Sequence, residues 1–335
     1  MRLSILTATL IALAAPAFAE GEVNLYSSRH YDTDERLYSD FEKQTGITIN
    51  RIEAKASALS ERIKAEGKNS PADVFITTDV GRIWRAEQEG ILQPVTSDML
   101  DEKIPAHLRD PGNHWYGFSQ RARMIFFAKD RVTEPPMTYE DLADPKYRGL
   151  ICARSSSNIY MQSLLASIIA HHGVEEATAW AQGLKDNLAR KPQGGDTDQL
   201  RGLVSGECDI ALANSYYFSR ALRRDVKGLT DGTDGIGWVF PNQDGRGAHV
   251  NISAAGIAKH APNHDNALAF LEYLASPSAQ AYFSSGNDEY PVVKGAALSE
   301  SVKTLGDFEA DDLSLRELGT HQREAQKIYD RVDYQ

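Results

Sequence analysis

Residues 21–52 have the sequence GEVNLYSSRHYDTDERLYSDFEKQTGITINRI, and this stretch decides the fold class. An apolar strand is expected over 22–26, and a second apolar run follows directly after Gly46. Between the two, Leu37 and Phe41 lie on one face of a helix that Gly46 ends, as glycine commonly does. Strand, helix and strand in this order predict a largely parallel sheet with helices on its faces.

The same alternation continues along the chain and resumes after a break. Further strands are expected at 72–77, 121–128, 149–154, 208–213, 235–240 and 249–257, and helices near 59–63, 83–84, 159–171, 199–204 and 216, over 264–283, and in the tail after 294. A chain of 335 residues is longer than the chains that usually fold around one hydrophobic core, so two lobes are expected.

Two extended strands, 121–128 and 249–257, are suited to cross between these lobes. We therefore predict an α/β protein with two lobes, each a mixed sheet flanked by helices, joined by two extended crossovers that form a hinge. The predicted lobes are 20–118 with 250–290, and 119–249 with 291–335.

The N-terminal segment has the pattern of an export signal. Arg2 supplies a positive charge, an apolar run follows over 3–15, and Ala17-Phe18-Ala19 is a small-x-small cleavage site. The apolar run is shorter than the roughly 20 residues that span a membrane. We therefore expect residues 1–19 to be removed and the mature protein to lie in the periplasm.

Charge and motif content exclude two classes of function. The chain carries 47 Asp and Glu against 36 Lys and Arg, whereas nucleic-acid binding requires a clustered positive face. The sequence also has no GxSxG, HExxH or P-loop motif, so neither a nucleophile nor an ATP site is indicated. We expect a monomeric protein that is not an enzyme and binds no nucleic acid.

The two cysteines, Cys152 and Cys208, favour one disulfide, because an even number in an exported chain usually pairs. The alternative is a pair of small buried apolar side chains. Neither cysteine has a CxxC partner or a nearby histidine, so a metal site of the zinc type is not indicated.

Tyrosines follow three of the expected strands. In open α/β sheets, ligands bind beyond the carboxyl ends of the strands. Three segments stand there, each with tyrosine near the first turn of the next helix and a Ser, Asn or Asp suited to capping: SSRHY (27–31), SSSNIY (155–160) and NSYY (214–217).

Phenolate chemistry gives these tyrosines a candidate role. A phenol has a pKa near 10, but a helix N-terminus favours an anion and a trivalent cation favours the phenolate far more. Several phenolates from separate elements form a hard, oxygen-rich site that suits ferric iron better than zinc. The alternative is a stacking surface for an organic ligand, or half-buried tyrosines with a solvated hydroxyl.

These segments resemble the periplasmic ferric-iron-binding proteins of ABC importers. The likeness extends over nearly the whole mature chain and includes SPADVF (70–75), QRAR (120–123) and NDEYPV (287–292). It implies the type II periplasmic-binding-protein fold, Fe(III) as the transported ligand, and an inner-membrane permease with a cytoplasmic ATPase as partners. It also implies four iron ligands, Tyr31, Tyr160, Tyr216 and Tyr217.

The resemblance implies further residues around the metal. His30 is an additional candidate ligand, which in some relatives coordinates and in others stands aside. Arg121 and Arg220 are expected to bind a phenolate or a bound anion, because guanidinium forms strong hydrogen bonds with anions. An anion or water then completes the coordination shell. No carboxylate ligand is evident, and Glu53 is only a fallback.

A second function stays open at this point. The same cleft suits an oxyanion, a polyamine or thiamine, since such sites also use aromatic stacking, arginine and helix N-termini.

Overall fold

The computed structural model describes residues 21–29 and 31–335. The predicted signal peptide, 1–19, and His30 lie outside these residues. The strands are β1 (Gly21–Ser27), β2 (Ile47–Glu53), β3 (Val74–Thr78), β4 (Tyr116–Ala128), β5 (Ile151–Cys152), β6 (Ile210–Asn214), β7 (Ile236–Val239), β8 (Val250–Ile257) and β9 (Tyr290–Pro291). The α-helices are α1 (Asp34–Thr45), α2 (Ala56–Glu66), α3 (Val80–Gln88), α4 (Asp98–Lys103), α5 (Ile159–Asp186), α6 (Asp196–Ser205), α7 (Ser215–Arg223), α8 (His264–Leu274), α9 (Pro277–Asn287), α10 (Glu300–Leu305) and α11 (Leu315–Arg331).

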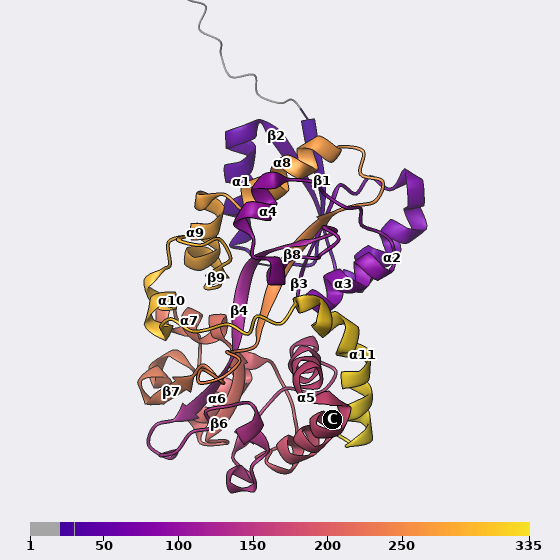
Figure 1. The fold of residues 1–335 in the computed structure, drawn as a ribbon. Helices are drawn as coiled ribbons and strands as arrows, with labels where there is room; N and C mark the ends of the chain where they lie inside the picture. The colour runs from indigo at the N-terminus through magenta and orange to yellow at the C-terminus, as the bar shows by residue number, and fades with distance from the viewer. Residues whose placement is uncertain (1–20, 30) are drawn as a thin grey trace, which may run out of the picture.

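The strands form one continuous sheet that runs through two halves of the molecule (Figure 1). Their order is β2-β1-β3-β8-β4-β6-β5, with β7 and β9 also paired to β4. The pairs β1–β2, β1–β3 and β5–β6 are parallel, whereas β8 and β4 are antiparallel to their neighbours. The predicted fold class, two mixed α/β halves joined by extended strands, is therefore confirmed.

Strand β4 is the physical connection between the halves. Its residues 116–122 pair with β8, and β8 pairs in turn with β3 of the upper half in Figure 1. Residues 123–128 of β4 pair instead with β6 and β7 of the lower half. The sheet therefore passes from one half to the other through β4 and β8, while the lobe boundaries at 118 and 290 stay predictions.

The C-terminal end of α1 follows the expected local chemistry, whereas another predicted helix is divided. Gly46 ends α1 at φ 76°, and its N–H donates to the carbonyl of Glu42. The single helix predicted over 264–283 is wrong, because the chain forms α8 and α9 with a break at Ala275 and Ser276. Pro277 has no N–H to donate and stands at the first turn of α9, and the side chain of Ser276 caps that helix.

Helix α11 lies against both halves. It packs along α5 in the lower half and touches α3 in the upper half, as Figure 1 also shows. Among the described residues, no helix is both long and apolar enough to cross a membrane.

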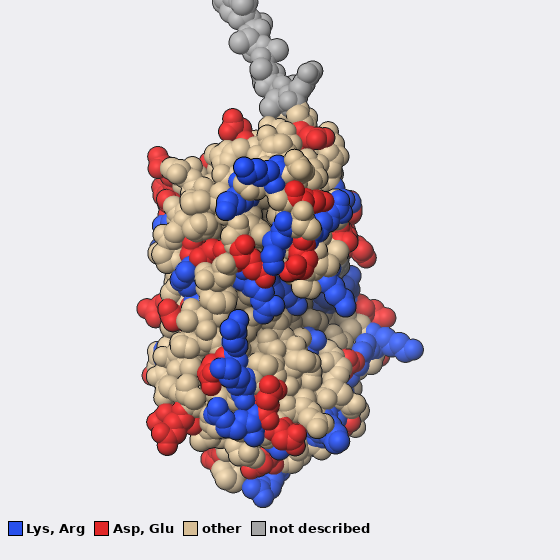
Figure 2. Space-filling model, turned by 90° about the vertical axis from the view of Figure 1, so that its right-hand side faces the viewer, with Lys and Arg blue, Asp and Glu red and all other residues tan. Residues whose placement is uncertain are grey.

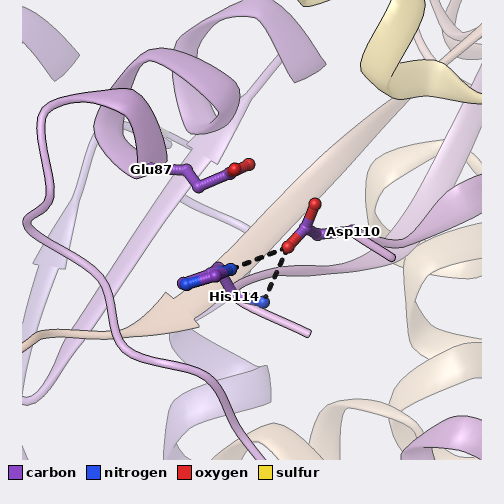
Figure 3. A group of neighbouring side chains, drawn as sticks. All are labelled: Glu87, Asp110 and His114. Atoms are coloured by element: carbon purple, nitrogen blue, oxygen red, sulfur yellow. Dashed lines mark hydrogen bonds and ion pairs between the residues drawn. The ribbon is translucent and has the colours of Figure 1, made fainter. Parts of the chain in front are cut away.

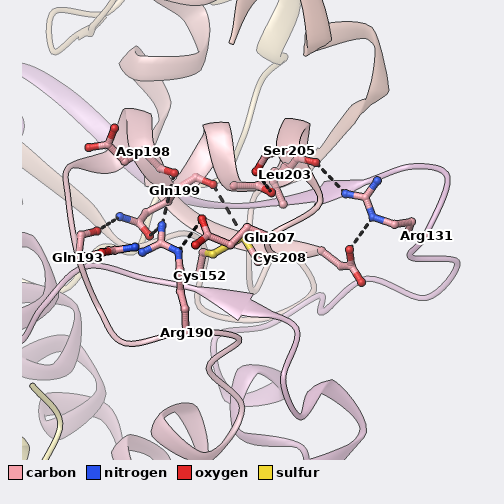
Figure 4. Close-up of a disulfide and its surroundings, with 12 residues drawn as sticks. Arg131, Cys152, Arg190, Gln193, Asp198, Gln199, Leu203, Ser205, Glu207 and Cys208 are labelled. Carbon is pink, nitrogen blue, oxygen red and sulfur yellow. Dashed lines mark hydrogen bonds and ion pairs between the residues drawn. A yellow bond between two sulfur atoms is a disulfide. The ribbon is translucent and has the colours of Figure 1, made fainter. Parts of the chain in front are cut away.

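The predicted disulfide between Cys152 and Cys208 is present (Figure 4). It joins the end of β5 to the turn before β6, with 5.8 Å between the two Cα atoms. Gly202 of α6 passes so close that an added Cβ would lie 2.7 Å from the sulfur of Cys208. The bridge therefore ties two parallel strands to the helix that covers them.

Candidate metal centre

The three strand-to-helix turns that carry the predicted tyrosines come from different parts of the sheet. Tyr31 lies between β1 and α1, Tyr160 opens α5, and Tyr216 and Tyr217 open α7. At α5 the side chain of Asn158 accepts a hydrogen bond of 3.0 Å from the backbone N–H of Tyr160. This cap fixes the start of the helix and with it the phenol in its first turn.

The structure brings the tyrosines of the lower half into direct contact. The hydroxyl oxygens of Tyr160 and Tyr216 lie 3.3 Å apart. The rings of Tyr216 and Tyr217 are 4.2 Å apart with an interplanar angle of 30°. Adjacent residues on a regular helix diverge, but these two stand at the helix entry, so both rings project to the same side. Three phenols therefore share one small region.

Tyr31 of the upper half belongs to the same electrostatic cluster. Burial raises the pKa of its phenol, and Glu289 and Tyr160 raise that pKa further. Burial likewise raises the pKa of Tyr216 well above its usual value, with Tyr160, Tyr31 and Tyr217 adding to it. Each phenol makes the ionisation of the others harder, so a stable tetraphenolate requires a cation of high charge at their centre.

Both arginines that the sequence predicted face the phenols, and Arg154 also lies 5.4 Å from the ring centre of Tyr160. The guanidinium carbon of Arg121 lies 5.8 Å from the ring centre of Tyr160. Arg121 donates to the hydroxyl of Ser253 at 3.1 Å, while its buried Nε and Nη2 have no hydrogen-bond partner among residues 21–29 and 31–335. Arg220 lies 5.5 Å and 5.9 Å from the ring centres of Tyr216 and Tyr217. Both predicted arginines thus stand at the cluster, and Arg121 has free N–H donors there.

Sequence reasoning missed two buried charges at this place. Arg29 is almost completely buried, binds Asp34 at 2.9 Å and lies 4.8 Å from the ring centre of Tyr31. Glu289 is fully buried, and its oxygens lie 3.5 Å from nitrogens of both Arg29 and Arg121. One signal in the sequence could have indicated Glu289, because it directly precedes the apolar run 290–293. A carboxylate that is buried with such a run needs a cationic partner.

The fallback Glu53 ends β2 beside Arg51, whose Nη1 is 3.5 Å from it. A different group of potential ligands, Glu87, Asp110 and His114, has its ligating atoms within 4.8 Å of one another (Figure 3). Arg316 of α11 already fills this group, with its Nη1 2.7 Å from both Glu87 and Asp110. The group is therefore an ion-paired contact of α11, and Arg316 takes the place that a cation would need.

A cavity of about 660 Å³ opens next to the turns that carry Tyr31 and Tyr160. Its walls come from the end of β1, from α2 and α3, and from the start of α5, and include Lys55, Arg82 and Arg85. Figure 2 shows Lys and Arg side chains around a hollow at mid-height on the face that carries α2, α3 and α11. Because Glu61 and Glu89 also line the cavity, its lining has only a small excess of positive charge.

The chain is similar to known solute-binding proteins over most of its length. Residues 69–305 match the family model of bacterial extracellular solute-binding proteins. Iron uptake protein A1 of Synechocystis sp. is 49% identical over 314 residues, which cover 93% of this chain and 87% of that protein. The major ferric iron-binding protein of Neisseria meningitidis serogroup B is 27% identical over 320 residues, covering 94% and 93%.

Solved structures have the same fold. A Trichodesmium protein in complex with iron and citrate ligands has a TM-score of 0.91 at 52% identity, with 94% of this chain and 100% of that chain covered. A Bordetella ferric binding protein has a TM-score of 0.87 at 39% identity, covering 93% and 99%.

Proposed function

Because this chain belongs to the bacterial extracellular solute-binding protein family, we propose that it captures ferric iron between its two lobes and delivers it to an ABC importer. The observation that carries the proposal is the convergence of Tyr160, Tyr216 and Tyr217 with the electrostatically coupled Tyr31, beside the free donors of Arg121. We propose these four tyrosines as the ligands, with His30 supporting them or coordinating only conditionally.

The charge balance supports a trivalent cargo. Four phenolates bring four negative charges, which a cation of charge three nearly cancels. The buried Arg29 is paired with Asp34, and Arg121 stands near Glu289, so the surrounding arginines and carboxylates largely neutralise one another. A divalent ion leaves a larger uncompensated negative charge, and burial makes such a charge expensive.

A bound anion fits the unpartnered atoms of Arg121. Its Nε and Nη2 form a fork that suits a carboxylate, and buried donors without partners are costly. The Trichodesmium relative holds citrate with its iron, which supports a hydroxycarboxylate as the anion here. Water takes this position where no anion is bound.

We further propose that the protein acts in the periplasm as a monomer, with a permease and a cytoplasmic ATPase as its partners and with no catalytic activity of its own. The relatives of Serratia marcescens and Haemophilus influenzae are called periplasmic proteins, which supports this location. Capture requires lobe closure, because ligands from both lobes give the closed state its higher affinity.

The test is a titration of the purified, iron-free protein with ferric iron. A visible tyrosinate-to-iron absorption band is expected to grow to one equivalent. Tyr216→Phe with Tyr217→Phe removes most of the band, whereas Tyr273→Phe, on α8 against Phe41, leaves it unchanged. A protein that binds no iron, or a double variant with the wild-type band, overturns the proposal.

A further inference from the structure

Asp79 stands at the junction of β3 and α3 in an unusual backbone conformation. Its φ of 76° and ψ of 126° lie in a region that residues with a Cβ rarely adopt. Asp79 is also fully buried. Such a strained, buried charged residue persists only where surrounding contacts hold it, and strained residues gather at sites that switch or bind.

The contacts of Asp79 come from three different elements. Its carboxylate accepts from the backbone N–H of Gly81 in α3 and from the amide of Asn251 in β8, each at 2.9 Å. It also accepts from the hydroxyl of Ser163 in α5, 3.0 Å from both carboxylate oxygens. The side-chain oxygen of Asn251 accepts in turn from the N–H of Val80 at 2.8 Å.

These elements belong to both halves of the molecule. Helix α3 lies in the upper half, α5 in the lower half, and β8 is one of the strands that connects them (Figure 1). The bond from Ser163 to Asp79 is therefore a bond across the two lobes, made where the connecting strands pass.

The same bond is tied to the metal centre through α5. Ser163 follows Tyr160 by three residues, which places both on the same face of the helix one turn apart. The cap at Asn158 holds the N-terminal end of this turn. The hydrogen bond from Ser163 to Asp79 holds its C-terminal end. Asp79 also lies within electrostatic reach of Arg121.

We propose that Asp79 and Ser163 form a closure contact that holds the first turn of α5, with Tyr160, against the upper lobe when metal is bound. The inference rests on the proposed function, because closure is the capture step. A contact formed fully only in the closed state stabilises that state and slows metal release. Asp79 is in this sense a positioning residue and touches no metal itself.

The chain provides a matched pair of variants for the test. Ser163 and Ser167 are both buried serines of α5, one turn apart, but the hydroxyl of Ser167 has no hydrogen-bond partner in the part of the chain that the structure describes. Ser163→Ala therefore deletes the contact between the lobes, and Ser167→Ala deletes a hydroxyl without one. Alanine is the best helix former, so both variants keep α5 helical.

The measurement is the rate at which a competing chelator removes ferric iron from each protein. Ser163→Ala is expected to release iron about 5- to 30-fold faster than the wild type, which corresponds to the loss of one hydrogen bond to a buried carboxylate. Its absorption band keeps the wild-type position, because all four phenols remain. Ser167→Ala is expected to release iron at the wild-type rate.

Hydrogen exchange of the wild-type protein gives an independent check that does not depend on how the variants fold. Iron is expected to slow exchange at the amides of Val80 and Gly81, whose acceptors belong to this contact. Equal release rates for Ser163→Ala and the wild type, or unchanged exchange at both amides, overturn the inference while iron binding stands. A wild-type protein that binds no iron overturns the proposed function itself.

Discussion

Replacing Arg121 with methionine is expected to weaken iron binding and to shift it to higher pH. Arg121 is almost completely buried, and its guanidinium carbon lies 5.8 Å from the ring centre of Tyr160. Two unit charges at that distance, with an effective dielectric constant of about 20, attract each other by about 3 kcal/mol. At 1.36 kcal/mol for each factor of ten, one phenolate loses about 100-fold of its stabilisation.

The direction of the pH shift follows from the proton balance. Phenols must lose protons when the metal binds, and Arg121 lowers the pKa of Tyr31 and Tyr216 against the raising effect of burial. Without Arg121 these pKa values rise and protons compete better with the metal. Because four phenols release protons together, a 100-fold loss of affinity moves the pH of half-loading up by about 0.5 unit. Glu289 then faces the phenols with one cationic partner fewer, which adds to the same effect.

The assay is the tyrosinate-to-iron band, followed during pH titrations from pH 8 to pH 5 in the presence of a fixed concentration of chelator. Arg121→Lys is the control, because it keeps the charge and loses the planar fork, and it is expected to fall between the wild type and Arg121→Met. A wild-type pH midpoint for Arg121→Met, in a protein that still melts cooperatively, refutes the electrostatic role of Arg121.

Three further changes give results that do not depend on iron. Replacing Cys152 and Cys208 with serine is expected to lower the free energy of unfolding by about 4 kcal/mol in denaturant titrations, because the bridge closes a loop over a sequence separation of 56; a change below 1 kcal/mol contradicts this estimate. Burial lowers the pKa of His249 to about 3, so its neutral form contributes stability above pH 6.5 that is lost as the pH falls towards 3. Between pH 6.5 and 5, His249→Gln should therefore lose about 2 kcal/mol less of its free energy of unfolding than the wild type. An equal loss in both proteins contradicts the role of His249. Arg316→Leu removes a cation from the half-buried Glu87 and the buried Asp110, and should lower the melting temperature with a loss of about 1–3 kcal/mol, whereas Arg36→Leu on the surface of α1 should change stability by less than 1 kcal/mol.

The fold was predictable wherever hydrophobic periodicity and chain breaks agree. The strands and helices from β1 to α3, with Gly46 and Gly67 at the ends of α1 and α2, lie within a few residues of their predicted places. The single helix predicted over 264–283 was wrong. The prediction followed the apolar spacing, which continues across Pro277, and gave too little weight to the backbone N–H that proline lacks. The strand predicted over 149–154 is only Ile151–Cys152, which pair with Ile210 and Ala211 of β6.

The tyrosines of the candidate site were predictable because each follows a strand and opens a helix, a position that local sequence encodes. Their joint surroundings were not. Arg29 and Glu289 are 260 positions apart in the sequence. Glu289 reaches the site because β9, which follows it directly, pairs with β4. No local pattern records such a contact, because its energy comes from charges that meet after folding.

The sequence by itself determined the alternation of strands and helices and the place of each tyrosine at the end of a strand. These features rest on residue spacing, capping and apolar periodicity, which act over a few residues. Only the tertiary structure decided which phenols touch, which charges surround them and how Asp79 joins the two lobes. The physical reason is that burial, Coulomb energy and hydrogen bonding between distant segments depend on the distances that the folded sheet sets.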